Sequence, residues 1–190
     1  MKKHLTGLVL AGGRGTRMGG VDKGLVDLQG RPLVAHVIDR LRPQVSQLLI
    51  SANRHVDRYA GFGAPVVVDA TPDFPGPLAG MSAGLSRCET EWLVTAPCDA
   101  PHLPSDLASE LLRVARALRT RAAFATFDDE PSYVCALLHR SLAPSLAATL
   151  ERGDRSVHRW LDMHEACAVP FALPIGARAN LNTPEDVAAC

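Results

Sequence analysis

Short apolar runs alternate along the chain with longer segments in which apolar residues recur every three or four positions. The runs end at glycine, proline or acidic residues, and they predict strands at residues 5–10, 47–51, 65–68, 92–96, 122–127, 133–138 and 166–169. The helical spacing predicts a first helix opened by Pro32, further helices at 78–88, 104–118, 142–150 and 156–161, and a helix start at 183–186. Strands and helices alternate over the first two thirds of the chain. We therefore predict an α/β fold with a mostly parallel central sheet flanked by helices, in a single domain covering residues 1–190.

Three polar features follow three of the predicted strands. A glycine-rich loop comes after the strand at 5–10, Asp69 ends the strand at 65–68, and Asp99 follows the strand at 92–96. In open parallel sheets, ligands bind beyond the carboxyl ends of the strands, so these features should lie at one edge. Pro97 and Pro101 restrict the backbone on either side of Asp99, which would fix the direction of its carboxylate. We expect a ligand site at this edge of the sheet.

The glycine-rich loop carries the strongest chemical signal. It holds six glycines between residues 12 and 24, together with Arg17 and Lys23. Glycines let backbone N–H groups approach phosphate oxygens, and the two cations add positive charge. No Gly-Lys pair is followed by Ser or Thr, and the glycine spacing does not fit the dinucleotide fingerprint. The loop therefore predicts a nucleotide-phosphate site of another type.

Lysine is rare in this chain. The lysines are Lys2, Lys3 and Lys23, against seventeen arginines. A compact ammonium differs from a planar guanidinium in shape and hydrogen bonding, so its use at Lys23 indicates a specific role. Chance is the alternative.

The segment from Leu10 to Lys23 resembles the L-A-G-G-x-x-x-R-M-G signature, with its downstream lysine, of the molybdenum cofactor guanylyltransferases. Further matches to that family follow in the same order, at residues 51–54, 75–81, 97–101 and 180–185. The resemblance covers nearly the whole chain. It implies a Rossmann-like nucleotidyltransferase fold of the glycosyltransferase-A-like type. It also implies that GMP passes from GTP to the phosphate of molybdopterin, releasing pyrophosphate and forming the molybdopterin guanine dinucleotide.

The same resemblance implies roles for individual residues. The guanine and ribose would be lined by Leu10, Ala11, Gly12 and Gly13. Asp69 would contact the guanosine moiety, and Gly80 would let the backbone come close to the base. Ser51 stands where the family often has Asn, although Asn53 keeps an amide nearby. Asn180 and Asn182 would lie on the molybdopterin side. Residues 130–137 resemble the family's pterin-side strand only loosely, so no role is transferred to them.

The implied reaction brings two anions together. Repulsion between unit charges about 4 Å apart is about 4 kcal/mol at an effective dielectric constant of about 20. Mg²⁺ held by Asp99, with Lys23 and Arg17, would offset this repulsion and stabilise the leaving group. The attacking phosphate is already ionised at neutral pH, so no general base is required.

Composition limits the other partners and the location. Twenty basic residues balance twenty acidic ones, which gives no reason to expect nucleic acid as a partner. No apolar stretch is long enough to cross a membrane, and the N-terminal run is too short for a signal peptide. Five scattered cysteines are typical of reduced thiols, so we expect a cytoplasmic protein. Its partners would be GTP and molybdopterin, together with proteins of cofactor synthesis and molybdoenzyme maturation.

Several other groups have a chemical and a structural interpretation. His102 is a metal ligand or a plain loop histidine, and Cys98 is a reactive thiol or a small buried side chain. The cluster Arg152, Asp154, Arg155 and His158 is an anion site or a solvated helix start. The acidic residues 128–130 indicate a solvated turn.

Two other functions compete with guanylyl transfer. A cytidylyltransferase usually has alanine where Gly12 stands, which would crowd the base pocket. A non-catalytic cofactor carrier of the same fold would be expected to lack Asp99 or Lys23, and both are present. We expect the form of the family that has no fused P-loop domain.

Overall fold

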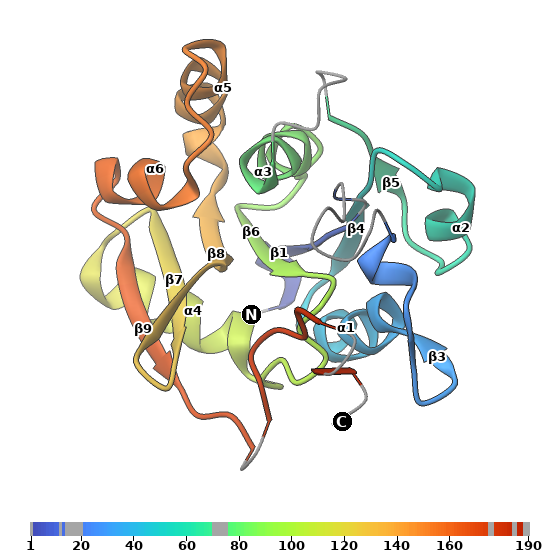
Figure 1. Ribbon diagram of the computed structural model, residues 1–190. Helices are drawn as coiled ribbons and strands as arrows, with labels where there is room; N and C mark the ends of the chain where they lie inside the picture. Colours follow the sequence, from blue (N-terminus) through green and yellow to red (C-terminus); the bar gives the residue numbers. More distant parts are fainter. Residues whose placement is uncertain are drawn as a thin grey trace.

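A seven-stranded sheet runs through the middle of the computed structural model (Figure 1), which describes residues 2–11, 13, 21–69, 76–174, 177–183 and 186–187. The strand order is β5-β4-β1-β6-β8-β7-β9. Its strands are β1 (Leu5–Leu10), β4 (Gln47–Ser51), β5 (Val66–Val67), β6 (Trp92–Pro97), β7 (Ala122–Phe127), β8 (Glu130–His139) and β9 (Cys167–Phe171). Strand β8 runs antiparallel to both of its neighbours, and the other described pairings in this sheet are parallel. The predicted α/β fold with a mostly parallel sheet is confirmed.

Helices cover both faces of the sheet. They are α1 (Leu33–Leu41), α2 (Val56–Ala60), α3 (Pro77–Ser86), α4 (Leu107–Leu118), α5 (Ala143–Glu151) and α6 (Val157–Met163). Shorter 3-10 turns are η1 (Lys2–His4), η3 (Lys23–Leu25), η4 (Arg42–Gln44) and η5 (Arg140–Leu142), and a small hairpin joins β2 (Asp27–Leu28) to β3 (Arg31–Pro32). None of the described helices is long and apolar enough to span a membrane.

Alternating side chains of the strands pack into two hydrophobic layers, one on each face of the sheet. Helices α1 and α4 lie on one face, and α3, α5 and α6 lie on the other (Figure 1). On β1, Val9 packs in the layer of α1 and α4, whereas its neighbour Leu8 packs in the layer of α3 and α6. Successive side chains of a strand point to opposite faces, so a strand with helices on both sides must be apolar throughout. This explains why the strands were recognisable as continuous apolar runs.

The structure corrects some details of the predicted elements. Pro32 does not stand in the first turn of α1: its backbone is extended (ψ 141°), it pairs with Asp27, and it precedes the helix. Helix α4 begins at Leu107 rather than 104, with Asp106 at its N-cap position. The β2–β3 hairpin and α2 were not predicted, because segments of two to five residues carry too little periodicity. The predicted helix start near 183 is confirmed at Thr183, whose Oγ1 accepts a hydrogen bond from the Asp186 N–H at 3.2 Å.

A bulge in β8 shapes the edge of the sheet where the ligand site was expected. Phe124 pairs with Ala136, but Ala125 pairs with Ser132, so residues 133–135 are extra in the ladder. On the side of β8 that faces away from β7, Thr95 of β6 bonds to the backbone of the bulged segment. Its Oγ1 donates to the Val134 carbonyl at 2.7 Å and accepts from the Ala136 N–H at 3.3 Å. A buried threonine hydroxyl therefore replaces backbone pairing beside the bulge.

We expect Thr95→Val to lower the free energy of unfolding by about 2 kcal/mol, because it removes a fully buried hydroxyl and leaves a carbonyl and an N–H without their partner. Urea denaturation measures this change. Thr126→Val is the matched control on β7, since no hydrogen bond of the Thr126 hydroxyl is found among the described residues. Equal stability of the two variants would show that the hydroxyl does not hold the bulge.

Candidate functional site

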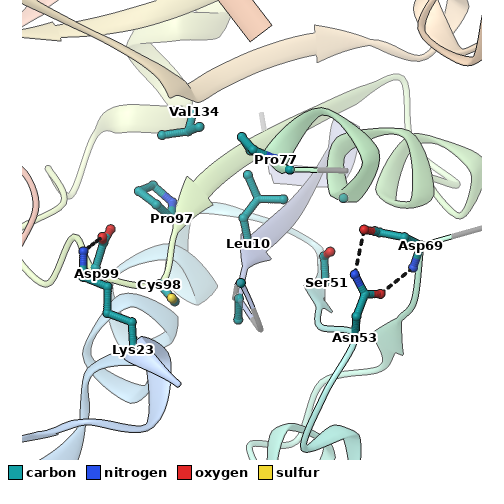
Figure 2. Close-up of a pocket in the computed structure, with 14 residues that line it drawn as sticks. Leu10, Lys23, Ser51, Asn53, Asp69, Pro77, Pro97, Cys98, Asp99 and Val134 are labelled. Carbon is teal, nitrogen blue, oxygen red and sulfur yellow. Dashed lines mark hydrogen bonds and ion pairs between the residues drawn. The ribbon is translucent and has the colours of Figure 1, made fainter. Parts of the chain in front are cut away.

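A cavity of about 460 Å³ opens at the carboxyl ends of β1, β4 and β6 (Figure 2). The sequence-predicted residues that line it are Leu10, Ala11, Gly13, Lys23, Asn53, Asp69, Gly80 and Asp99. Gly12 and Arg17 lie outside the described residues. Side chains distant in sequence are thus brought to one edge of the sheet, as parallel strands require.

Lys23 and Asp99 meet at one end of the cavity (Figure 2). The Lys23 Nζ donates to Asp99 Oδ2 and also to Asn182 Oδ1, the latter at 2.9 Å. The Lys23 side chain is 21% exposed and the Asp99 side chain is 13% exposed, so the ion pair is largely shielded from water. The Leu181 N–H donates to the Asp99 carbonyl at 2.9 Å, which joins the C-terminal segment to the turn that carries Asp99.

Asp99 offers one oxygen to a further ligand. Its Oδ1 is buried and has no hydrogen-bond partner among the described residues. Mg²⁺ in nucleotide sites is held by one or two carboxylates together with phosphate oxygens and water, and a single carboxylate oxygen beside a phosphate pocket fits that mode. Within the described ranges, no three His, Cys, Asp or Glu side chains come together as a metal-binding group.

Asn53 and Asp69 form a reciprocal pair at the other end of the cavity (Figure 2). The Asn53 Nδ2 donates to Asp69 Oδ2 at 2.7 Å, and the Asp69 N–H donates to Asn53 Oδ1 at 2.8 Å. Burial raises the pKa of Asp69 above its ordinary value, while the hydrogen bond from Asn53 acts in the opposite direction. Asp69 Oδ1 is buried without a partner among the described residues, so it can accept a hydrogen bond from a ligand.

Small residues let α3 press against the strands between these two ends. A Cβ built on Gly80 would lie 2.6 Å from Ser51 Oγ and 2.8 Å from Leu10 Cδ2. The contacts of Gly80 are therefore helix-to-sheet packing as well as cavity lining. Ser51 is 4% exposed and lies beneath this helix, and its carbonyl accepts from the Ala11 N–H at 2.8 Å. The small serine fits the close approach of α3, and the nearby amide of Asn53 is engaged by Asp69.

A second cavity of about 500 Å³ adjoins the first, with Pro77 and Val134 lining both. Tyr133 and His158 form a flat wall of this second cavity, with ring centroids 4.6 Å apart and planes at 23°. Ser132 Oγ and Asn180 Oδ1 are buried there without partners in the described part of the chain. The second cavity thus combines a stacking surface with unpaired polar atoms.

Asn182 connects the two cavities. It lines the second cavity while its side chain accepts from Lys23 of the first. Its backbone N–H, together with that of Thr183, donates to Asp186 Oδ2 at 2.7 and 2.9 Å, which fixes the segment. Asn182 therefore links the second cavity to the Lys23–Asp99 ion pair of the first.

The sequence did not identify Ser132, Tyr133 and Val134, at and beside the bulge, as lining a cavity, and it offered His158 only as part of an anion site for the pterin phosphate. The alternation of β8 shows no sign of the bulge, and its match to the family was loose. Two signals were available: Ser132, which directly precedes the apolar run at 133–138, and the charged cluster at 152–158 that includes His158. For residues 152–158, the structure supports the helix-start interpretation: Asp154 accepts from the Ser156 N–H and from Arg159, and Ser156 accepts from the Arg159 N–H.

The remaining candidates resolve as structural groups. Burial raises the pKa of the Cys98 thiol, and the neighbouring carboxylates of Asp99 and Asp22 raise it further, so the thiol stays protonated. His102 lines neither cavity, and burial, with Arg40 and His36 nearby, lowers its pKa. Asp128 and Asp129 form the solvated turn that was predicted, both with positive φ.

Similarity to known proteins extends over almost the whole chain. Residues 7–167 match the family model of the MobA-like NTP transferase domain. A molybdenum cofactor guanylyltransferase from Yersinia pseudotuberculosis is 50% identical over 186 residues, which are 98% of this chain and 94% of that protein. The solved structure of molybdopterin-guanine dinucleotide biosynthesis protein A from Archaeoglobus fulgidus has a TM-score of 0.77 at 22% identity, covering 96% of this chain and 95% of that one. A manganese complex from Mycobacterium tuberculosis has a TM-score of 0.74 at 20% identity, covering 98% and 96%.

We expect Asp69→Asn to raise the melting temperature near neutral pH. Because burial raises the pKa of Asp69 in the folded protein, the folded state binds the proton more tightly than the unfolded chain does. The stability from this proton is present below the ordinary pKa of 3.8 and is lost as the pH rises through the raised pKa. Asparagine resembles the neutral acid and can still accept from Asn53.

Thermal melts between about pH 3 and pH 8 test this expectation, because they span the ordinary pKa of an aspartate. The gain should vanish in acid, and Asp57→Asn, at an exposed position on α2, should give no such gain. A variant that melts below the wild-type protein at neutral pH would show that the charged hydrogen bond to Asn53 outweighs the cost of burial.

Proposed function

The chain belongs to the molybdenum cofactor guanylyltransferases and carries their MobA-like NTP transferase domain, and on this premise we propose that it transfers GMP from GTP to the phosphate of molybdopterin. An oxygen of the molybdopterin phosphate attacks the α-phosphorus of GTP and forms a new P–O bond. The bond between the α-phosphorus and the bridging oxygen breaks, and pyrophosphate leaves. The observation that carries the proposal is a pair of adjoining cavities that share Pro77 and Val134, with Asn182 of the second cavity bonded to the Lys23–Asp99 pair of the first.

GTP is assigned to the first cavity. The base and ribose lie against Leu10, Ala11 and Gly13, at the end of the cavity that holds the Asn53–Asp69 pair. A carboxylate oxygen without a partner suits the N–H donors of a guanine edge, which a cytosine presents in a different arrangement. The triphosphate extends toward Lys23 at the opposite end. On the sequence pattern alone, Gly12 is assigned to the base and ribose and Arg17 to the triphosphate.

A divalent cation fits at Asp99, and we assign it as Mg²⁺. The carboxylate Oδ1 is unpaired among the described residues, while Oδ2 is held by Lys23. When bound, the cation would neutralise phosphate charge and stabilise the pyrophosphate leaving group. The Lys23 ammonium acts on the same anions and keeps the acceptor phosphate and the triphosphate from repelling each other.

Molybdopterin is assigned to the second cavity. Its flat ring system would lie on the Tyr133–His158 stack, and its polar edge would reach Ser132 Oγ and Asn180. Its phosphate would point toward Asn182, which touches Lys23. The nucleophile is an ionised phosphate, so the residues at the junction orient and neutralise it, and none has to remove a proton.

The proposal extends to further partners and to the location of the protein. Transfer of a labile cofactor suggests contact with proteins of cofactor synthesis and of molybdoenzyme maturation. The described cysteines at 88, 98, 135 and 167 are free thiols, which supports a cytoplasmic location.

Base selectivity is the first test. Mg²⁺·GTP at about 100 times its dissociation constant should stabilise the fold by about 2.7 kcal/mol, which raises the melting temperature of a chain of this size by about 5–10 °C. Mg²⁺·CTP at the same concentration should give a much smaller shift. Pyrophosphate release with molybdopterin present should follow the same order. A larger shift and faster release with CTP would identify a cytidylyltransferase.

The role of Asp99 is the second test. Asp99→Asn keeps the size of the side chain but loses the charge, so pyrophosphate release should fall by about 100-fold or more. Asp99 does not cap α4, whose N-cap residue is Asp106, so no helix cap is lost, but the largely buried Lys23 loses its charged partner and the melting temperature should fall as well.

Asp106→Asn is the matched control, because Asp106 is exposed and makes no side-chain capping bond. Melts and rates for both variants across a Mg²⁺ titration decide the question. A lowered melting temperature with normal turnover for Asp99→Asn would make this residue structural and would remove the assigned cation site.

A further inference from the structure

We propose that Asp22 and Tyr59 are positioning residues that hold the Lys23 turn in the orientation that brings its ammonium to Asp99, an inference that rests on the proposed role of Lys23 in binding the triphosphate. Asp22 immediately precedes Lys23, yet its side chain is only 3% exposed. A buried carboxylate is costly unless it is paired or hydrogen-bonded. The partners of the Asp22 carboxylate therefore indicate which structural role its burial serves.

Among the described residues, the side-chain partners of Asp22 come from the segment that follows β4. The Tyr59 hydroxyl donates to Asp22 Oδ1 at 2.6 Å. His55 Nδ1 lies 2.9 Å from Asp22 Oδ2, and Arg54 Nε lies 3.5 Å from the same oxygen. Arg54 also donates from Nη2 to the Val21 carbonyl at 3.1 Å. We name Asp22, Arg54, His55 and Tyr59 the Asp22 anchor. It ties the start of the Lys23 turn to α2 and to the residues preceding it.

The carboxylate of Asp22 is used for this tertiary contact rather than for the local turn. Asp22 occupies the N-cap position of η3, where an aspartate commonly accepts from its own turn, but its side chain makes no capping bond. The turn is closed instead by backbone bonds, from the Leu25 N–H to the Asp22 carbonyl and from the Val26 N–H to the Lys23 carbonyl. The side chain therefore fixes where the turn lies, while the backbone fixes its shape.

Gly24 supplies an independent sign that the turn is seated on Tyr59. A Cβ built at Gly24 would lie 2.5 Å from the Tyr59 hydroxyl oxygen and 3.3 Å from both Cβ and Sγ of Cys98. Tyr59 is fully buried, so it cannot move aside into solvent. Cys98 directly precedes Asp99, and Lys23 lies alongside both (Figure 2). The turn is thus held between the Tyr59 hydroxyl and the strand end that carries Asp99.

These contacts set the position of the Lys23 ammonium. The flexible four-carbon side chain of lysine can reach many points unless its backbone is fixed. The anchor fixes the residue before Lys23, and Tyr59 with Cys98 confines the residue after it. Arg54 and His55 face the charge of Asp22, which leaves Lys23 to pair with Asp99 and Asn182.

The chain offers a direct test because its lysines are Lys2, Lys3 and Lys23 alone. In the full-length protein with ¹³C-labelled lysine side chains, the Lys23 signals should stand apart from those of Lys2 and Lys3, which are exposed. Asp22→Asn, Tyr59→Phe and Gly24→Ala should each move the Lys23 signals toward the other two. The same variants should raise the dissociation constant of Mg²⁺·GTP by about fivefold or more, since the ammonium no longer faces the phosphates.

Asp39→Asn is the matched control, because it removes a carboxylate from the exposed pair with Arg31 and should change neither readout. Tyr59→Phe keeps the buried ring, so it tests the hydroxyl even where another variant folds poorly. Lower melting temperatures with unchanged Lys23 signals and unchanged GTP affinity would overturn the proposal. Lys23 signals that move as expected in a protein that does not bind Mg²⁺·GTP would support the positioning role and contradict the proposed function.

Discussion

The ion pair between Lys23 and Asp99 holds three distant parts of the chain at one point. Lys23 comes from the turn after the glycine-rich loop, Asp99 follows β6, and Asn182, which accepts from the same ammonium, belongs to the C-terminal segment. Both charged side chains are largely buried, so separating these segments would leave a charge without a partner in a poorly hydrated place. Through Asn182, the pair therefore links the first cavity to a residue that lines the second.

Small residues make this convergence possible. Gly24 lets the Lys23 turn rest on Tyr59 and Cys98, and Gly80 lets α3 rest on Leu10 and Ser51. At each position a single methyl group would meet an atom of a buried or packed neighbour. The positions of the cavity walls therefore depend on how closely these backbone segments pack against their neighbours. Because that packing is tight, the backbone that carries the polar side chains can move little.

At the same edge of the sheet, several buried polar atoms that could bind a ligand have no hydrogen-bond partner among the described residues, which lowers the stability of the fold. Asp69 Oδ1, Asp99 Oδ1, Ser132 Oγ and Asn180 Oδ1 are buried without hydrogen-bond partners in the part of the chain described by the structure. An unsatisfied buried group costs about 1–3 kcal/mol, which a ligand of matching chemistry can recover. Four of the seven such atoms found among the described residues belong to residues that line the two cavities, where a functional protein is expected to depart from full internal pairing.

Much of the architecture follows from local patterns of residues that are close in sequence, and it could therefore be predicted. The apolar runs identified the strands of the main sheet, because a strand covered on both faces is apolar at every position. Asp69 and Asp99 were placed at one sheet edge because parallel strands end together, and the glycine-rich segment indicated a phosphate site. Pro32 differs: local preference assigned it to a helix, but it pairs with Asp27 in the small hairpin.

Other features depend on contacts between residues far apart in sequence. The Asn53–Asp69 pair, the Tyr133–His158 stack and the bond from Tyr59 to Asp22 join residues 16, 25 and 37 positions apart. Thr95 of another strand bonds to the backbone at the bulge in β8. The sequence by itself determined the periodic elements and the chemistry at their ends, because periodicity reflects which face of each element is buried. Only the tertiary structure decided which polar groups pair and which remain open to a ligand, because burial and pairing are properties of the packed chain.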